Sequence, residues 1–117
     1  MKTNTIMAKI YYYIGISFIF RTNDHLPIHI HGKKGEYESK AELIIEDGKI
    51  VDVVVKRVNG KKCLKDKGLD NFLTFVKRKS YDIRDKWISF YVDGIKPKFE
   101  KYDKKGNISK SGKSQYN

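Results

Sequence analysis

Hydrophobic and polar residues alternate along the first part of the chain, and this alternation predicts strands. Residues 9–14 are rich in tyrosine and isoleucine, which are residue types that favour a pleated strand. Gly15 interrupts the pattern, and residues 16–21 form either a second strand or a continuation of the first. Within residues 11–13, the alternation favours a buried Tyr12 between two half-exposed tyrosines.

A short strand with a two-residue period follows at residues 28–31. Its alternation turns Ile28 and Ile30 to one side of a sheet and His29 and His31 to the other. The next four residues, 32–35, are expected to close a hairpin, with glycines at both ends available for positive φ. Residues 36–55 are then expected to form an antiparallel hairpin.

Apolar residues change to helical spacing in the second half of the chain. Two stripes with separations of three and four residues predict two helices after a polar connector at residues 57–68. Trp87 belongs to the second stripe and is expected to pack between helix and sheet. The first stripe contains Leu69, Phe72, Leu73 and Val76, and the second contains Ile83, Trp87, Ile88 and Tyr91.

This order of elements favours an α+β fold, because strands come first and helices follow without alternation. We expect a small antiparallel sheet of about four strands, followed by two C-terminal helices packed on one face. A length of 117 residues suits one domain, which we place at residues 6–100. Residues 101–117 are rich in lysine and poor in apolar residues, and are expected to form a basic, disordered tail.

The composition indicates a reducing compartment and no membrane span. Cys63 is the single cysteine, so the chain cannot form an internal disulfide. The apolar N-terminal stretch is interrupted by Lys9, Gly15 and Arg21 and is too short for a transmembrane helix. We therefore expect a cytoplasmic protein without a membrane partner.

The formal net charge is +11, and it is concentrated in one half of the chain. Residues 51–117 carry eighteen lysines and arginines against eight acidic residues. A field of one sign attracts polyanions and acidic proteins. Such a charge is equally compatible with a simple soluble surface, because net charge bears on association and not on fold.

All three histidines lie in residues 24–31, Asp-His-Leu-Pro-Ile-His-Ile-His. His29 and His31 share a strand face about 6–7 Å apart, and an H-x-H pair can present two imidazoles to one ion. His25 or Asp24, from the preceding turn, would supply a third ligand for a divalent metal such as zinc or iron. Asp24, His25, His29 and His31 are therefore candidate metal ligands.

The same histidines also suit metal-free chemistry. His25, His29 and His31 are candidate acid–base residues for hydrolysis of a phosphodiester, since general acid–base catalysis and charge stabilisation are sufficient. The cations that flank the motif and would steady the phosphate are Arg21, Lys33 and Lys34. The structural alternative carries equal weight. In that alternative the turn side chains satisfy backbone groups, Pro27 fixes the backbone, and the strand histidines are polar residues on a solvated face.

A second basic cluster falls at the junction of the two predicted helices. It is a candidate nucleic-acid contact, although a solvated helix face explains such a run as well. The cluster contains Lys77, Arg78, Lys79, Arg84 and Lys86.

The spacing of the histidine motif, the following Gly35-Glu36-Tyr37 and the terminal helical pair with its tryptophan resemble a bacterial family. This is the family described as domain of unknown function 4160, and the likeness covers about residues 6–100. Members of that family look like stand-alone proteins and are often encoded beside another small uncharacterised protein. The resemblance thereby suggests a toxin–antitoxin-like pair. The family supplies no residue with a demonstrated role. The resemblance and the charge together favour a binding module for nucleic acid or a small acidic partner protein, and the alternative is a histidine-dependent nuclease or hydrolase.

Overall fold

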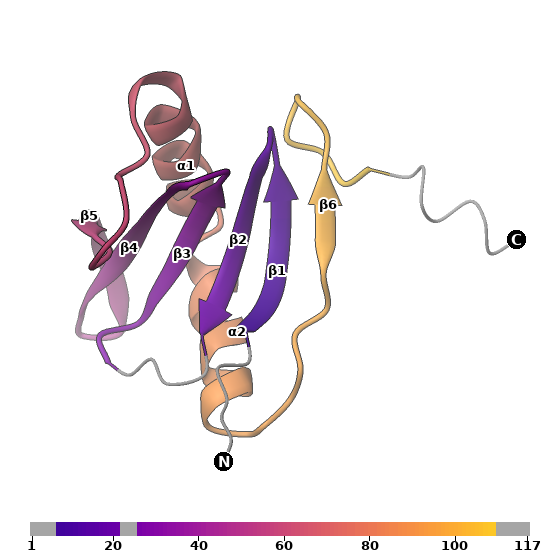
Figure 1. The fold of residues 1–117 in the computed structure, drawn as a ribbon. Helices are drawn as coiled ribbons and strands as arrows, with labels where there is room; N and C mark the ends of the chain where they lie inside the picture. Colours follow the sequence, from indigo (N-terminus) through magenta and orange to yellow (C-terminus); the bar gives the residue numbers. More distant parts are fainter. Residues whose placement is uncertain (1–6, 22–25, 110–117) are drawn as a thin grey trace, which may run out of the picture.

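The computed structural model describes residues 7–21 and 26–109, and within them it contains six strands and two helices. Figure 1 shows the strands side by side, with both helices behind the sheet. The elements are β1 (Met7–Tyr13), β2 (Ile16–Arg21), β3 (His29–Lys34), β4 (Tyr37–Glu46), β5 (Lys49–Arg57), α1 (Asp66–Arg78), α2 (Ser80–Tyr91) and β6 (Glu100–Tyr102).

The six strands form one mixed sheet in the order β5-β4-β3-β2-β1-β6. Strands β1 to β5 pair antiparallel with their chain neighbours, whereas β6 lies parallel to β1 at the far edge. The α+β class and the two helices agree with the sequence prediction. The prediction of about four antiparallel strands was too small, because β1 and β2 are separate strands and β6 was not foreseen.

The short strand predicted around the histidines is longer than its apolar residues indicate. Strand β3 continues through Lys34, and the turn falls at Gly35, which has a φ of 60°. Gly32 lies within the strand beneath the ring of Phe72, where a Cβ atom would lie 2.4 Å from two ring carbons. This glycine therefore permits close contact between α1 and the sheet.

A β-bulge in β1 changes which tyrosine is buried. The pairing with β2 shifts between Lys9 and Tyr11, so Ile10 and Tyr11 are both fully buried. Tyr12 lies on the opposite side of the sheet and is half-buried. The predicted burial of Tyr12 was wrong because a bulge moves one extra residue into the strand and reverses the alternation.

The core lies between one face of the sheet and the two helices. Phe72 and Phe75 of α1 pack against Phe18 of β2, with ring centroids 5.5 and 4.7 Å apart. Trp87 is buried in the same core, as its helical spacing predicted, and its ring contacts Tyr91. Large aromatic rings of this kind account for much of the apolar area that a small domain buries.

Part of the expected C-terminal tail belongs to the folded structure. Lys101 and Tyr102 are in β6, and Tyr102 is buried with its ring 5.9 Å from that of Tyr11. The backbone then turns back, and the Ser109 N–H donates to the Lys101 carbonyl at 2.7 Å. Residues 110–117 lie outside the described residues. Among the helices of the described residues, none is long and apolar enough to cross a membrane.

Candidate functional site

His29 and His31 lie together on the sheet face that the helices leave uncovered. Their ring centroids are 5.3 Å apart, and Ile28 and Ile30 are buried on the helix side. The predicted separation of histidines from isoleucines is therefore confirmed. The expectation of a solvated histidine face was wrong, since the two histidines are only 5% and 4% exposed.

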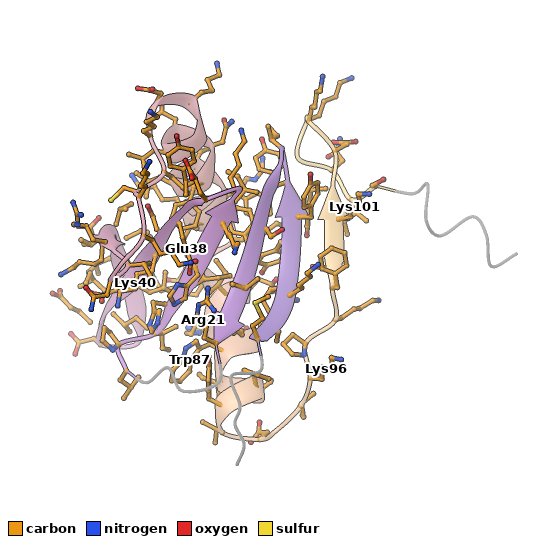
Figure 2. The ribbon with its side chains drawn as sticks, in the orientation of Figure 1. Arg21, Glu38, Lys40, Trp87, Lys96 and Lys101 are labelled. Carbon is orange, nitrogen blue, oxygen red and sulfur yellow. The ribbon has the colours of Figure 1, made fainter. Side chains whose placement is uncertain are left out.

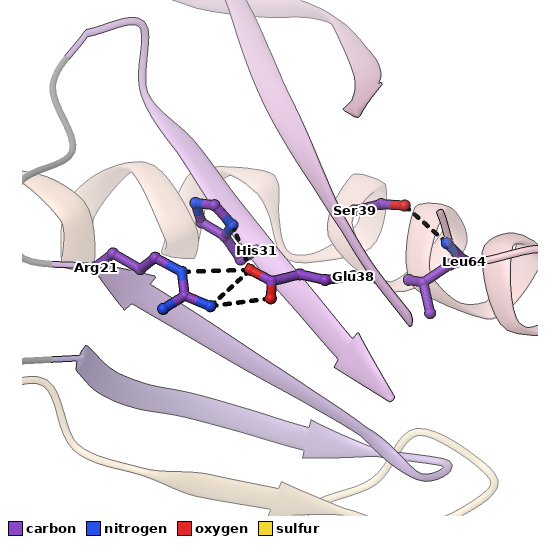
Figure 3. Close-up of polar contacts among 5 residues, drawn as sticks. All are labelled: Arg21, His31, Glu38, Ser39 and Leu64. Carbon is purple, nitrogen blue, oxygen red and sulfur yellow. Dashed lines mark hydrogen bonds and ion pairs between the residues drawn. The ribbon is translucent and has the colours of Figure 1, made fainter. Parts of the chain in front are cut away.

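The structure adds two partners to His31. Its Nδ1 lies 2.9 Å from Oε2 of Glu38 on β4, and Glu38 also accepts hydrogen bonds from Arg21 at 2.7, 2.9 and 3.3 Å. Figure 3 shows the Arg21 guanidinium and the His31 ring meeting the same carboxylate. Three strands, β2, β3 and β4, thus bring one group each to this buried cluster.

Because Glu38 is buried, the stability of this cluster depends on the groups that pair with its carboxylate. Glu38 is 1% exposed, whereas the side chain of Arg21 is 27% exposed and reaches the surface. A buried carboxylate is costly unless it is paired and hydrogen-bonded. The bidentate contact with Arg21, which is always charged, supplies the pairing, and His31 supplies a further hydrogen bond.

From the sequence, Arg21 was considered only as a cation that flanks the histidine motif, and Glu38 was not identified as a member of a site. Glu38 belongs to an alternating charged series in β4 that indicates an ordinary polar strand face. Its burial depends on the register that pairs β4 with β3 and β3 with β2. The one available signal was the position of Arg21 at the end of a strand expected to lie in the same sheet.

The contacts at Nδ1 set the chemistry that each ring can present. Nδ1 of His29 lies 2.8 Å from the carbonyl oxygen of Pro27, and Nδ1 of His31 lies beside the Glu38 carboxylate. Both neighbours are acceptors, so each Nδ1 carries the proton and donates. In a neutral ring the lone pair is then on Nε2, the arrangement found in histidines that bind metals or act as bases.

The metal prediction extends beyond the described residues, because Asp24 and His25 lie outside them. Within the described ranges, no group of three His, Cys, Asp or Glu side chains is able to hold a metal ion. His29 and His31 are brought together as predicted, and the third ligand stays a prediction. The Nε2 atoms of both rings are buried, so a substrate would reach them only after neighbouring side chains moved.

The five basic residues at the helix junction do not point to one surface. Lys79 and Lys86 lie towards β6, where Lys79 covers the ring of Tyr102 and Lys86 lies 3.6 Å from Glu100. Arg84 pairs with its neighbour Asp85 at 2.9 Å. Arg78 also lies towards this C-terminal segment, near the carbonyl of Gly106 in the turn after β6, whereas Lys77 lines a cavity beside β5.

Lys86 also takes part in a polar cluster behind the sheet. The Tyr11 hydroxyl donates to Asp82 at 2.5 Å, and Lys86 lies 3.1 Å from the same carboxylate. Burial and the neighbouring Asp82 raise the pKa of the Tyr11 hydroxyl far above its ordinary value. Burial by itself raises the pKa of Asp82, but hydrogen bonds from Tyr11 and Lys86 and the nearby lysine charges lower it below its usual range. This cluster links α2 to β1.

A set of lysines occupies the helix-free face around the histidine cluster. Strand register places them in two rows that cross the sheet, one through His31 and Ile19 and the other through Ser17 and Tyr12. Figure 2 shows Lys40 towards the left edge of the sheet and Lys101 at its right edge, with Arg21 between them. We call this set the lysine face; it comprises Lys9, Lys33, Lys40, Lys56 and Lys101.

Comparison with known proteins adds no functional assignment. No family model, no curated protein and no solved structure matches the chain. The resemblance to the domain of unknown function 4160 family is therefore neither supported nor contradicted by these comparisons.

Proposed function

We propose that the protein binds single-stranded nucleic acid on the helix-free face of its sheet. The observation that carries the proposal is the lysine face, to which five of the six strands contribute one lysine each. Phosphate contacts from lysine and arginine dominate the affinity of proteins for nucleic acids. An open sheet face is the surface on which several single-strand-binding modules hold their ligand.

The spacing of the lysines suits an extended polyanion. Lys56 lies opposite Lys40, and the same row continues through His31 and Ile19 to Lys9. Neighbouring strands are about 4.8 Å apart, so this row spans about 19 Å across the sheet. Such a span matches several successive phosphates better than a single small anion.

Glu38 and Glu42 on this face are already engaged within the protein, whereas Asp52 of β5 is exposed on it. Glu38 is paired with Arg21 and is buried. The Glu42 carboxylate is largely covered and lies 3.9 Å from the ammonium of Lys56. The positive charge therefore dominates what the face presents to solvent, where Lys9, Lys56 and Lys101 are exposed.

One aromatic residue lies within the lysine face. Tyr12 pairs across the sheet with Lys101, whose ammonium is 5.7 Å from the centre of its ring. A half-buried ring beside cations is a suitable platform for a base, because every base has a π face. A double helix is a poorer fit, since its sequence is read by an element that enters a groove, and the lysine face is a broad sheet surface.

The test measures the affinity for a labelled ten-nucleotide single-stranded RNA by fluorescence anisotropy at several salt concentrations. Contacts with about five phosphates give a slope of log K against log salt of about −3.5. Lys56→Glu with Lys101→Glu should weaken binding strongly. Lys96→Glu with Lys98→Glu makes the same charge change at exposed residues that line a cavity against α2, and should weaken it much less. Equal losses in the two variants, or no binding by the wild type, would contradict the proposal.

A second candidate function is histidine-dependent hydrolysis of the bound strand. It is favoured by the Nδ1 contacts of His29 and His31, which leave a lone pair on Nε2 in each neutral ring. Cleavage of the RNA that continues in chelator and disappears in His31→Asn would support metal-free acid–base chemistry. Cleavage that requires an added divalent metal would favour the metal hypothesis, and an intact RNA would leave binding as the function.

A further inference from the structure

A cavity of about 420 Å³ lies between the β3–β4 turn and the beginning of α1, on the side of the sheet away from the lysine face. Its wall is mainly apolar, and its rim carries three lysines. The residues that line it are Lys34, Gly35, Tyr37, Leu64, Lys65, Asp66, Lys67 and Gly68.

The wall of this cavity is held in place by hydrogen bonds to β4. The Glu38 N–H donates to the Lys62 carbonyl at 2.8 Å, and the Leu64 N–H donates to Oγ of the fully buried Ser39 at 2.9 Å. Figure 3 shows the second of these contacts. The connector between β5 and α1 is thus fastened to the sheet, and the cavity is preformed.

Chemically, the cavity combines an aromatic ring with an excess of positive charge. The ammonium of Lys65 lies 5.4 Å from the centre of the Tyr37 ring. Lys34, Lys65 and Lys67 are exposed, and Asp66 is the one acidic residue among those that line the cavity. A ligand with a flat apolar part and a phosphate satisfies both features, because the ring offers stacking and the ammonium groups offer charge.

The position of the cavity connects it to the lysine face. Lys33 belongs to that face, and Lys34 follows it in the chain and turns to the other side of the sheet. The side chain of Lys34 also lies beside Gly15, 3.3 Å from the position that a Cβ atom would take there. A single-stranded nucleic acid lying along the row through Tyr12 and Ser17 would reach the cavity by crossing the β3–β4 turn.

We infer that this cavity holds one nucleotide of the single strand bound on the lysine face, an inference that rests on the proposed function. The base stacks on Tyr37, and its neighbouring phosphates contact Lys34, Lys65 and Lys67. Binding moves the Lys65 ammonium from the Tyr37 ring to a phosphate. The cavity thereby makes the protein prefer a strand with bases over a plain polyanion.

The experiment compares the affinity of the full chain for two single-stranded ten-nucleotide probes. One is an oligodeoxyadenylate, and the other is an abasic strand with the same backbone. A stack of one base on an aromatic ring is worth about 5-fold or more in affinity, so the wild type should prefer the adenylate by at least that factor. Tyr37→Leu should lose most of this preference. Tyr37→Phe should keep the preference for the adenylate. Tyr12→Leu should keep the share of that preference that comes from the cavity.

A second measurement needs no variant. Adenosine 5′-monophosphate added to the isotope-labelled wild type should shift the backbone amide signals of Tyr37, Leu64 and Gly68, and ribose 5-phosphate should shift them much less. Failure of both oligonucleotides to bind would refute the proposed function. Binding of the strands with no preference for bases, or with amide shifts confined to the surroundings of Tyr12, would overturn the cavity assignment alone.

Discussion

Replacement of Arg21 by methionine tests the buried cluster most directly. The change removes three hydrogen bonds of 2.7–3.3 Å from the Glu38 carboxylate, which is 1% exposed. His31 then remains as a hydrogen-bonding partner that lacks a permanent charge. Removal of one member of a buried ion pair typically costs about 3–5 kcal/mol, because the other charge is left without compensation. Since the Arg21 side chain is 27% exposed and water can reach part of the pair, we expect the free energy of unfolding to fall by about 3 kcal/mol.

A double-mutant cycle separates this coupling from other effects of each substitution. Replacement of both members, Arg21→Met with Glu38→Met, removes the charges together, and such a replacement is often close to neutral. The double variant should therefore recover much of the stability that Arg21→Met alone loses. Urea unfolding at neutral pH gives the four free energies, and with a slope of about 1–3 kcal/mol per molar urea the single variant shifts the midpoint by about 1–3 M.

Two outcomes would refute this reasoning. The first is a loss below about 1 kcal/mol in Arg21→Met, which is the range of surface ion pairs. The second is additivity, in which the double variant loses as much as the two single variants together. Either result would mean that the Glu38 carboxylate does not depend on the guanidinium for its burial.

Three further predictions follow from other contacts. Gly32→Ala should cost about 1–3 kcal/mol, because its methyl group would lie 2.4 Å from ring carbons of Phe72; thermal unfolding measures the loss, and Phe72→Leu in the same chain should reduce it. The folded-state pKa of Asp82 is lowered, so its contribution to stability is present above the unfolded pKa of about 3.9 and is lost as the pH falls through the folded value. Urea unfolding at pH 7 and pH 3 should therefore show a smaller loss for Asp82→Asn than for the wild type, and equal losses would contradict the assignment. Tyr102→Ala should destabilise the protein by about 3 kcal/mol, because it removes a buried ring that contacts Tyr11; unchanged chemical unfolding would mean that β6 contributes little.

Local spacing along the chain was sufficient for most of the fold. The two-residue period marked the segments of β1 to β5, although it left open whether β1 and β2 are one strand or two. It also placed His29 and His31 on one side of their strand, and the helical period located both helices. These features are determined locally, because the direction of a side chain follows from the geometry of its own element. The same reasoning failed at Tyr12, where a bulge depends on the neighbouring strand, and at residues 101–102, where a short polar segment becomes a strand by pairing with β1.

Pairing between strands, and not local spacing, determines which distant residues share a surface. Arg21, His31 and Glu38 meet because the register aligns three strands, and the lysine face exists because five strands each contribute one lysine to the same side. Charge density along the sequence pointed instead to residues 77–86, which the helices direct to different surfaces. The physical reason is that period and propensity act within about ten residues, whereas burial of a charge and assembly of a charged face depend on pairing between segments that the chain keeps apart.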